Sequence, residues 1–133
     1  MLVSTRGRYA LRFLVDLARN REAGYITVHE LAERQEVSKK YAERLMAILS
    51  RGKFVETRHG AGGGYRLGVE PEECRVSDVL AAMSEELAPV ECMKCDINTC
   101  PRARICPTLP MWKKLGGMIH DFFDGITLAD LMK

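Results

Sequence analysis

The chain has 133 residues and a mass of 15.0 kDa; 47% of its residues are hydrophobic, 29% are charged, and its formal net charge is +2. This length and composition fit one small folded domain and exclude a disordered chain. No apolar run reaches the ~18–20 residues that a bilayer requires, and the first residues lack the apolar stretch of an export signal, so we expect a soluble cytoplasmic protein with no membrane partner.

The charge is unevenly divided between the two halves of the chain. Residues 1–67 contain 13 Lys and Arg against 7 Asp and Glu, a net charge of +6, whereas residues 68–133 contain 7 against 11, a net charge of −4. Such an asymmetry is typical of a protein in which one part binds a polyanion. The first half is therefore the candidate for binding nucleic acid.

Three helices are predicted in the basic half. The first covers about residues 7–19, where apolar residues recur three and four positions apart. The second opens at Thr27, whose spacing from Glu30 is that of a capping box, and should end near residues 35–37. The third covers residues 39–50, with Ser38 as its cap and Gly52 closing it in the left-handed conformation. Its spacing turns inward Tyr41, Leu45, Ile48 and Leu49 and leaves outside Lys39, Lys40, Glu43, Arg44 and Ala47.

A glycine-tipped hairpin is predicted next. Residues 54–58 and 65–67 have the composition of short strands, and residues 59–64 between them include four glycines. Such a run suits a tight turn or a backbone that approaches a ligand closely. The glycine-rich motif of nucleotide-binding loops is absent from the sequence.

The second half is predicted to contain a short helix, a loop and a long helix. The short helix covers residues 77–84 and would bury Val76, Val79, Leu80 and Met83. The long helix should run from residue 111 to 124, stop at Gly125 and be followed by a turn at 127–131. Its apolar face is made of Trp112, Leu115, Ile119 and Phe122, widened by Met111, Met118 and Phe123. Because one small domain offers little cover for so apolar a helix, we expect two protomers to share it.

The order of these elements is that of a winged helix-turn-helix. We therefore expect a mainly α fold with a small β-hairpin wing: residues 1–70 as the DNA-binding region, 71–88 as a connecting helix, 89–110 as a Cys-rich loop and 111–133 as a dimerisation helix with a terminal turn. The third helix would enter the major groove of double-stranded DNA, and the hairpin would follow the backbone into the next groove. The candidate DNA-binding residues are Ser38, Lys39, Lys40, Tyr41, Arg44, Arg58, His59, Gly60, Gly62 and Arg66. A solvated helix face and a simple turn are the alternatives.

The five cysteines are also unevenly placed. Cys74 stands alone and is interpreted as a small buried hydrophobe. The other four lie within fifteen residues, at Cys92, Cys95, Cys100 and Cys106. In a chain without an export signal, clustered thiols indicate metal or redox chemistry before structural disulfides. An iron–sulfur cluster, a structural zinc ion and a thiol switch, with a reversible Cys92–Cys95 disulfide, all remain open.

Four segments resemble the Rrf-two family of bacterial transcription regulators: TRGRYAL at 5–11, SKKYAERL at 38–45, GAGGGYRLG at 60–68 and ITLADL at 126–131. The similarity spans essentially the whole chain. It implies a homodimer with a crossed long helix, bound to a roughly palindromic operator. Members commonly carry Arg-Gly-Pro before the triple glycine, where this chain has His59, Gly60 and Ala61, with Arg58 one place earlier.

The resemblance also bears on the cysteines. Cluster-binding members use three cysteines before the long helix, and the best match implied is Cys92, Cys100 and Cys106, with Cys95 as a possible fourth or alternative first ligand. The cluster would be of the two-iron–two-sulfur or four-iron–four-sulfur type. The leading hypothesis is thus a homodimeric regulator, expected to be a repressor, whose operator affinity responds to this cluster.

Two other functions are weighed against it. The first is a constitutive or thiol-switch regulator with zinc or no metal in the loop. The second is a redox electron carrier, which is disfavoured because nothing in the sequence marks a nucleotide- or flavin-binding unit. We expect no enzymatic activity.

Overall fold

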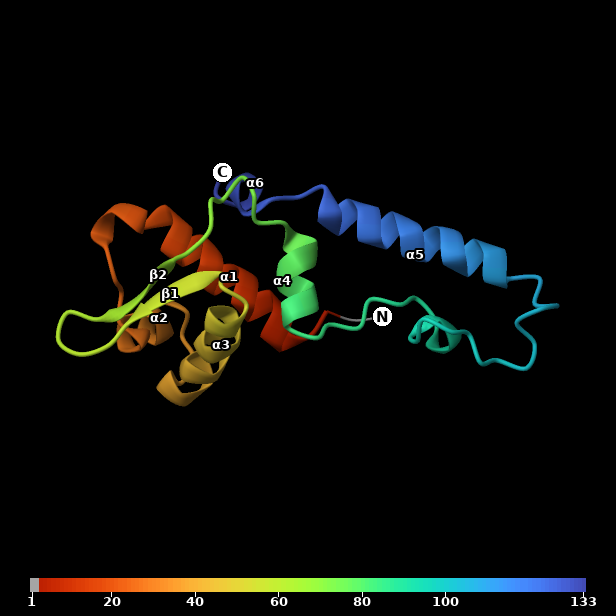
Figure 1. The fold of residues 1–133 in the computed structure, drawn as a ribbon, viewed down its shortest axis with the longest axis horizontal. Helices are drawn as coiled ribbons and strands as arrows, with labels where there is room; N and C mark the ends of the chain where they lie inside the picture. The colour runs from red at the N-terminus through yellow and green to blue at the C-terminus, as the bar shows by residue number, and fades with distance from the viewer. Residues whose placement is uncertain (1–2) are drawn as a thin grey trace.

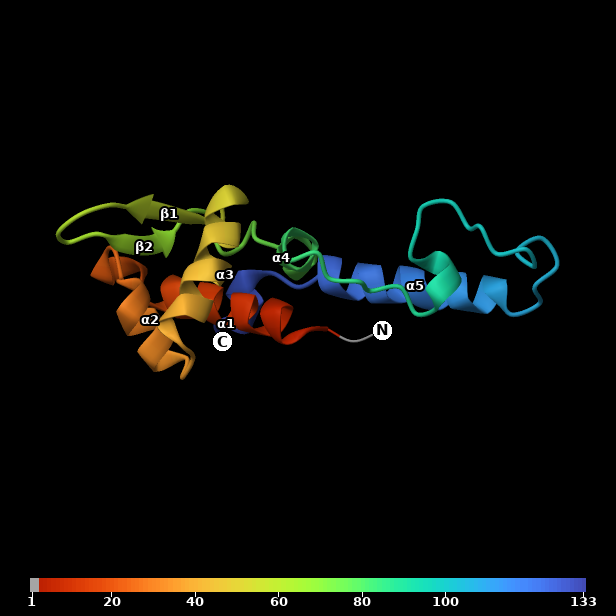
Figure 2. The same cartoon turned by 90° about the horizontal axis from the view of Figure 1, so that it is seen from below.

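The computed structural model describes residues 3–133, and Figure 1 shows their arrangement. The elements follow in the order α1 (Thr5–Arg19), η1 (Arg21–Ala23), α2 (Val28–Arg34), α3 (Lys39–Arg51), β1 (Val55–Arg58), β2 (Gly64–Leu67), α4 (Val76–Ala82), η2 (Glu91–Met93), α5 (Leu109–Asp124) and α6 (Leu128–Leu131). We call residues 3–85 with 126–133 the body, and residues 86–125 the arm. In both views α5 and the cysteine-rich segment extend away from the body (Figures 1 and 2).

Helix α1 forms the floor of the body's core. Its buried residues are Gly7 and the apolar residues that recur three and four positions apart, Ala10, Phe13, Leu14, Leu17 and Ala18. The helix begins at Thr5, earlier than predicted, because its first turn has two caps. The Ser4 hydroxyl accepts a hydrogen bond from the Gly7 N–H at 3.3 Å, and the Glu85 carboxylate accepts from the same N–H at 3.0 Å. Glu85 comes from after α4, so the sequence near Gly7 gives no sign of this cap.

Helices α2 and α3 form the helix-turn-helix. The turn between them places Glu36 at a φ of 55°, and the Val37 N–H donates to the Ala32 carbonyl at 3.0 Å. The predicted capping box is only half formed. The Thr27 hydroxyl accepts from the Glu30 N–H at 3.1 Å, but the Glu30 carboxylate pairs with Arg34 at 2.6 Å.

The end of α3 also differs from the prediction. Gly52 has a φ of −78°, and the left-handed residue is Lys53, with a φ of 63°. The Phe54 ring lies over Gly52, and a Cβ there would be 2.8 Å from it. Gly52 is therefore needed for its missing side chain, and Lys53 makes the turn that leads into β1.

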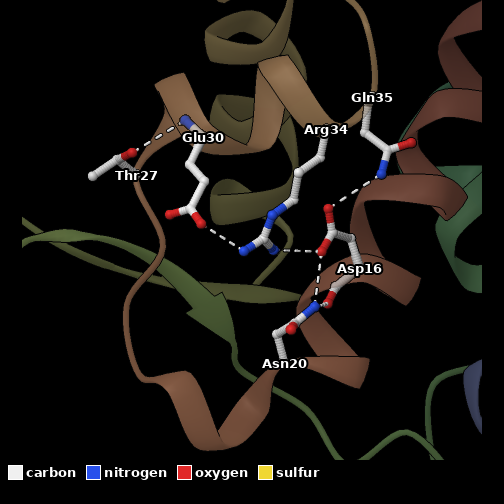
Figure 3. Close-up of polar contacts among 6 residues, drawn as sticks. All are labelled: Asp16, Asn20, Thr27, Glu30, Arg34 and Gln35. Carbon is white, nitrogen blue, oxygen red and sulfur yellow. Dashed lines mark hydrogen bonds and ion pairs between the residues drawn. The ribbon is translucent and has the colours of Figure 1, made fainter.

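A polar network fixes the helix-turn-helix to α1 (Figure 3). The Asp16 carboxylate is 8% exposed and accepts hydrogen bonds from Arg34 at 2.8 Å, Gln35 at 3.2 Å and Asn20 at 3.0 Å. Arg34 thus bridges Asp16 of α1 and Glu30 of α2. Among the described residues no buried side-chain nitrogen or oxygen lacks a hydrogen-bond partner, and the bonds to Asp16 orient α2 on α1.

The predicted hairpin is present. Strands β1 and β2 pair antiparallel, with Val55 opposite Leu67 and Glu56 opposite Arg66. Ile26, just before α2, exchanges two backbone hydrogen bonds of 2.8 Å with Tyr65 of β2. This bridge anchors the hairpin to the segment that leads into the helix-turn-helix.

The end of the chain closes the body. The predicted face of α4 is buried, and Leu128 of α6 packs into the same core. The Leu128 N–H donates to the Cys74 carbonyl at 2.7 Å, and Thr127 and Asp130 form a complete capping box. At the end of α5, the Asp124 carboxylate accepts from Ser77 at 2.9 Å and from Arg75 at 3.2 Å. These bonds anchor one end of the arm.

The rest of the arm has little cover. Of the α5 residues, only Leu109 is buried. Met93 of the preceding segment packs against Gly116, where a Cβ would lie 3.0 Å from its methyl carbon. In both views the hairpin tip and the cysteine-rich segment lie at opposite ends of the long axis (Figure 2). Within residues 3–133, no helix is long and apolar enough to cross a membrane.

Candidate nucleic-acid interface and cysteine segment

The outer face of α3 is exposed and basic. Lys39, Lys40 and Arg44 are exposed, as are Glu43 and Ala47, whereas the helix buries Ala42, Leu45, Met46 and Leu49. Tyr41 and Ile48, predicted to face inward, are half-buried. Among residues 3–133, none of the three cationic side chains forms an ion pair. A helix with such a face can enter the DNA major groove and meet phosphates or base edges.

Two further candidate residues hold the start of α3. The Ser38 hydroxyl accepts from the Tyr41 N–H at 3.1 Å and caps the helix. The Tyr41 ring lies edge-on to the Tyr9 ring of α1, with centroids 6.1 Å apart. Both residues therefore have structural contacts. Lys39 and Lys40, which lie between them in the sequence, and Arg44, which follows, are exposed.

The glycines of the hairpin tip have two different roles. Gly60 and Gly62, both candidate DNA-binding residues, have φ values of 88° and 73° and nothing of the protein within 4 Å of a built Cβ. They are needed for the turn and face open space. A Cβ on Gly63 would instead meet the Arg58 carbonyl at 2.2 Å, and one on Gly64 would meet the Ile26 carbonyl at 2.3 Å. Gly63 therefore allows the hairpin to close on itself, and Gly64 allows β2 to approach the backbone of Ile26.

The structure brings together two candidate arginines of the hairpin around a residue that the sequence analysis missed. The guanidinium carbons of Arg58 and Arg66 lie 5.8 Å and 4.7 Å from the ring centroid of Tyr25. The Arg66 Nε also donates to Glu56 at 2.6 Å. His59 is exposed at the tip. Tyr25 carries no signal of its own in the sequence, because only the pairing of Ile26 with Tyr65 places it beside the hairpin.

The four clustered cysteines are not gathered into a site. Within residues 3–133, no three Cys, His, Asp or Glu side chains converge where they could hold a metal ion. Cys95 is exposed, and Cys92, Cys100 and Cys106 are half-buried, all with free thiols. Their chemistry suits a soft metal or a cluster, but their arrangement does not yet fit one. Such a site would have to form as the segment folds around the metal.

Cys74 and Cys106 differ in their electrostatics. Burial, with a smaller effect of Asp78, raises the pKa of Cys74 to about 11, in agreement with its interpretation as a buried hydrophobe. The Thr108 hydroxyl, 3.3 Å from the Cys106 sulfur, lowers the pKa of that thiol, helped by the backbone N–H groups of Thr108 and Leu109. These contacts stabilise the thiolate form of Cys106, just before α5, relative to a thiol without such contacts.

The apolar face of α5 is open to solvent in the single chain. Phe122 is 63% exposed, Met118 61% and Met111 55%. Ile97 and Ile105 in the cysteine segment are exposed as well. A contiguous set of large exposed apolar side chains marks an interaction surface.

Comparison with known proteins gives consistent matches along the chain. A family model named Rrf2 (Rrf-two), described as an iron-dependent transcriptional regulator, matches residues 3–133. The chain is 35% identical over 133 residues to protein rrf2 of Nitratidesulfovibrio vulgaris, covering 100% of this chain and 88% of that protein. It is 34% identical over 132 residues to the HTH-type transcriptional regulator IscR of Aliivibrio salmonicida, covering 99% and 77%.

Solved structures give the same result. The fold is similar to that of CymR, the global cysteine regulator of B. subtilis, with a TM-score of 0.80 and 27% identity, covering 99% of this chain and 96% of that one. It is also similar to IscR of T. potens, with a TM-score of 0.75 and 32% identity, covering 99% and 86%. These likenesses confirm the predicted fold class, a mainly helical winged-helix protein with a two-stranded hairpin.

Proposed function

Because the chain belongs to the Rrf2 family of transcriptional regulators, we propose that it is a homodimeric repressor whose affinity for operator DNA responds to an iron–sulfur cluster. It is a DNA-binding regulator and not an enzyme, as its relatives and structural neighbours are. In this proposal residues 1–70 bind DNA, 71–88 connect, 89–110 hold the cluster and 111–133 dimerise. The protein would work in the cytoplasm, where its operator lies.

The exposed cationic face of α3 is the observation that carries DNA binding. Lys39, Lys40 and Arg44 lie on the surface of a helix whose other face is buried in the core. The Asp16 network holds this helix-turn-helix on α1, so the face is presented by a rigid body. Ser38 and Tyr41 order its first turn, and the hairpin adds Arg58, His59, Gly60, Gly62 and Arg66. Repression would follow from occupation of the operator.

The apolar face of α5 supports the homodimer. Leu115, Met118 and Phe122 are exposed along one side of a helix whose end is anchored to the body by Asp124. A second copy carries the same face, and a twofold pair of such helices buries both. Two wings then meet two half-sites, as a palindromic operator requires.

The thiols support the cluster. Cys92, Cys100 and Cys106 would hold the cluster, with Cys95 as a fourth or alternative first ligand. The cluster would be of the two-iron–two-sulfur or four-iron–four-sulfur type, with its iron bound by thiolates. The lowered pKa of Cys106 favours a ligating thiolate. The family description as iron-dependent and the likeness to IscR add support. The alternative is a constitutive or thiol-switch regulator whose loop holds zinc or no metal. The likeness to CymR, a cysteine regulator, supports testing this alternative as well.

DNA binding is tested by selecting sites from random duplexes and measuring affinity at fixed salt. We expect Lys40→Ala and Arg44→Ala each to weaken binding by about five- to hundredfold, because each removes a charged contact. Lys113→Ala, an exposed lysine of α5, is the matched control and should bind as the wild type does. If both α3 variants bind as tightly as the wild type, the proposed interface is wrong.

The homodimer is tested by light scattering on Phe122→Glu. The introduced charge should dissociate the dimer and reduce operator affinity about a hundredfold, while the circular dichroism of the body is retained. His120→Glu adds the same charge at an exposed position of α5 and should leave the dimer intact. Equal dissociation in both variants, or in neither, would remove α5 as the interface.

The cluster is tested by purifying the protein without oxygen and assaying iron, sulfide and zinc beside the visible spectrum. Brown protein with iron and sulfide, bleached when Cys92, Cys100 or Cys106 is replaced by serine, supports the cluster. Colourless protein with zinc supports the structural alternative. Equal operator affinity of the cluster-loaded and metal-free dimers at fixed salt would contradict the proposal that the cluster controls DNA binding, because such control requires a difference in binding free energy between the two forms.

A further inference from the structure

One face of the hairpin gathers three charged side chains and one aromatic ring. Residues two apart on a strand share a face, so Glu56 and Arg58 lie on the same side of β1. The register places Arg66 opposite Glu56 and Gly64 opposite Arg58. Because glycine has no side chain, Arg58 lacks a side-chain neighbour directly across the sheet. The Tyr25 ring, which comes from outside the hairpin, lies within 5.8 Å of its guanidinium.

The two arginines on this ring differ in their charge balance. Arg66 is closer to the centroid, at 4.7 Å, and its charge is matched by Glu56 at 2.6 Å. Arg58 is exposed and forms no ion pair among residues 3–133. A phosphate that approaches this face therefore meets an uncompensated positive charge at Arg58 and a neutralised pair beside it.

The ring itself is held by the fold. The residue after it, Ile26, exchanges two backbone hydrogen bonds with Tyr65 of β2, and the residue before it, Gly24, has a φ of 76°. The backbone on both sides of Tyr25 is thus determined by the turn and by pairing with the hairpin. An arginine that rests on such a ring gains a cation–π contact and has fewer conformations to lose when it binds.

We propose that Tyr25 is the positioning residue of the wing: its ring holds the Arg58 guanidinium ready for a DNA phosphate, while Arg66 and Glu56 complete the platform. This inference rests on the proposed function, in which the hairpin contacts DNA. It divides the two hairpin arginines into one that binds DNA and one that supports the platform. It also gives a role to Tyr25, which lies outside the helix-turn-helix and the hairpin.

The test measures the affinity of full-length variants for a random-sequence DNA duplex over a series of salt concentrations. Arg58→Ala should weaken binding about tenfold and lower the slope of log affinity against log salt by about 0.9, the value for one phosphate contact. The double variant Glu56→Gln with Arg66→Ala should weaken it less than about threefold, because it removes both charges of a balanced pair and leaves the net charge of the face unchanged. Arg19→Ala removes an exposed charge at the end of α1 that is not among the candidate DNA-binding residues, and this matched control should keep the affinity and the salt slope of the wild type.

Tyr25 is tested by paired substitutions. Tyr25→Phe keeps the ring and should bind as the wild type does, whereas Tyr25→Leu should bind about threefold more weakly with a reduced salt slope. If Tyr25 acts through Arg58, Tyr25→Leu with Arg58→Ala should be no weaker than Arg58→Ala alone. A purely structural role of the ring would instead lower the thermal midpoint and add to the effect of Arg58→Ala.

The outcomes separate this inference from the proposed function. Additive effects of Tyr25→Leu and Arg58→Ala, or a loss in the Glu56→Gln, Arg66→Ala double variant as large as that in Arg58→Ala, would overturn the positioning role while DNA binding stands. Loss of binding in Lys40→Ala with no effect of either hairpin arginine would overturn it as well. A wild-type protein that binds no duplex would overturn both.

Discussion

The body and the arm each contain an amphipathic helix, but the apolar stripe is buried in the body and exposed in the arm. In α3 of the body, Leu45 and Leu49 are buried by α1, α2 and the hairpin. In α5 of the arm, Leu115 and Phe122 occupy equivalent positions of an apolar stripe but are exposed. An amphipathic stripe therefore predicts that a face needs cover, and says nothing about whether the cover comes from the same chain.

The cysteines divide along the same line. Cys74 belongs to the body and is packed into its core, whereas the other four belong to the arm and are exposed or half-buried. Polar side chains differ too, because the body ties Asp16 and Glu85 into specific networks while the cysteine segment has mostly local turns. The apolar and polar groups of the body are thus packed or hydrogen-bonded within one chain, whereas the arm has exposed apolar side chains and free thiols.

The largest expected contrast is between one leucine from each region. Leu45→Ala should lower the free energy of unfolding by about 2–5 kcal/mol, because it leaves a cavity in a packed core. Leu115→Ala should have a much smaller effect in dilute protein and a growing effect at higher concentration, because Leu115 is 39% exposed in the single chain and would be buried further in the proposed dimer. Urea denaturation at two protein concentrations measures both, and a Leu115→Ala effect that is independent of concentration would contradict the contrast.

Thiol reactivity should distinguish the cysteines of the two regions. With a pKa of about 11, Cys74 is a thiolate in about one molecule in a thousand at pH 8, against about a quarter for an unperturbed thiol. In metal-free native protein, iodoacetamide should therefore modify Cys106, whose pKa is lowered, at least a hundredfold faster than Cys74. Mass spectrometry of the digested protein measures the rates; denaturant should abolish the difference, and rapid native labelling of Cys74 would contradict its burial.

The smallest expected effect concerns Glu85, which closes the body where the arm begins. Burial raises the pKa of Glu85. Hydrogen bonds from the Ser4 hydroxyl, the Ser4 N–H and the Gly7 N–H lower it by more, so that the net shift of the pKa is downward. Its stabilising effect is therefore complete above the pKa of the unfolded chain and is lost as pH falls through the lower folded value.

The matching measurement is thermal unfolding between neutral pH and acid for the wild type and Glu85→Gln. At pH 7 the variant should be about 1 kcal/mol less stable, the usual cost of a lost helix cap. The difference should shrink as the wild type becomes protonated. A constant difference across this range would mean that the Glu85 charge does not stabilise the start of α1.

Local patterns in the sequence were sufficient for the helices, the hairpin and the exposed face of α3. Residues three and four apart share a helix face, and residues such as Ser38 can cap only at a helix start, so Lys39, Lys40 and Arg44 were placed outside without a structure. The order of these elements gave the fold class, and the resemblance of the wing and helix motifs to the Rrf2 family agreed with it. The DNA contacts and cluster ligands themselves stay predictions.

Contacts between distant segments could not be read in this way. Glu85 caps α1 from 78 positions away along the chain. Glu30 pairs with Arg34, which also binds Asp16, instead of completing the capping box. The Phe54 ring lies over Gly52, and Lys53 is the left-handed residue of the turn. Tyr25 reaches Arg58 only because Ile26 pairs with Tyr65. Local sequence was enough to place the elements and their faces, since these depend on neighbours within one or two turns. The meeting of particular groups was set by the folding of the whole chain, since a hydrogen bond or a ring contact depends on distances between segments far apart in the sequence.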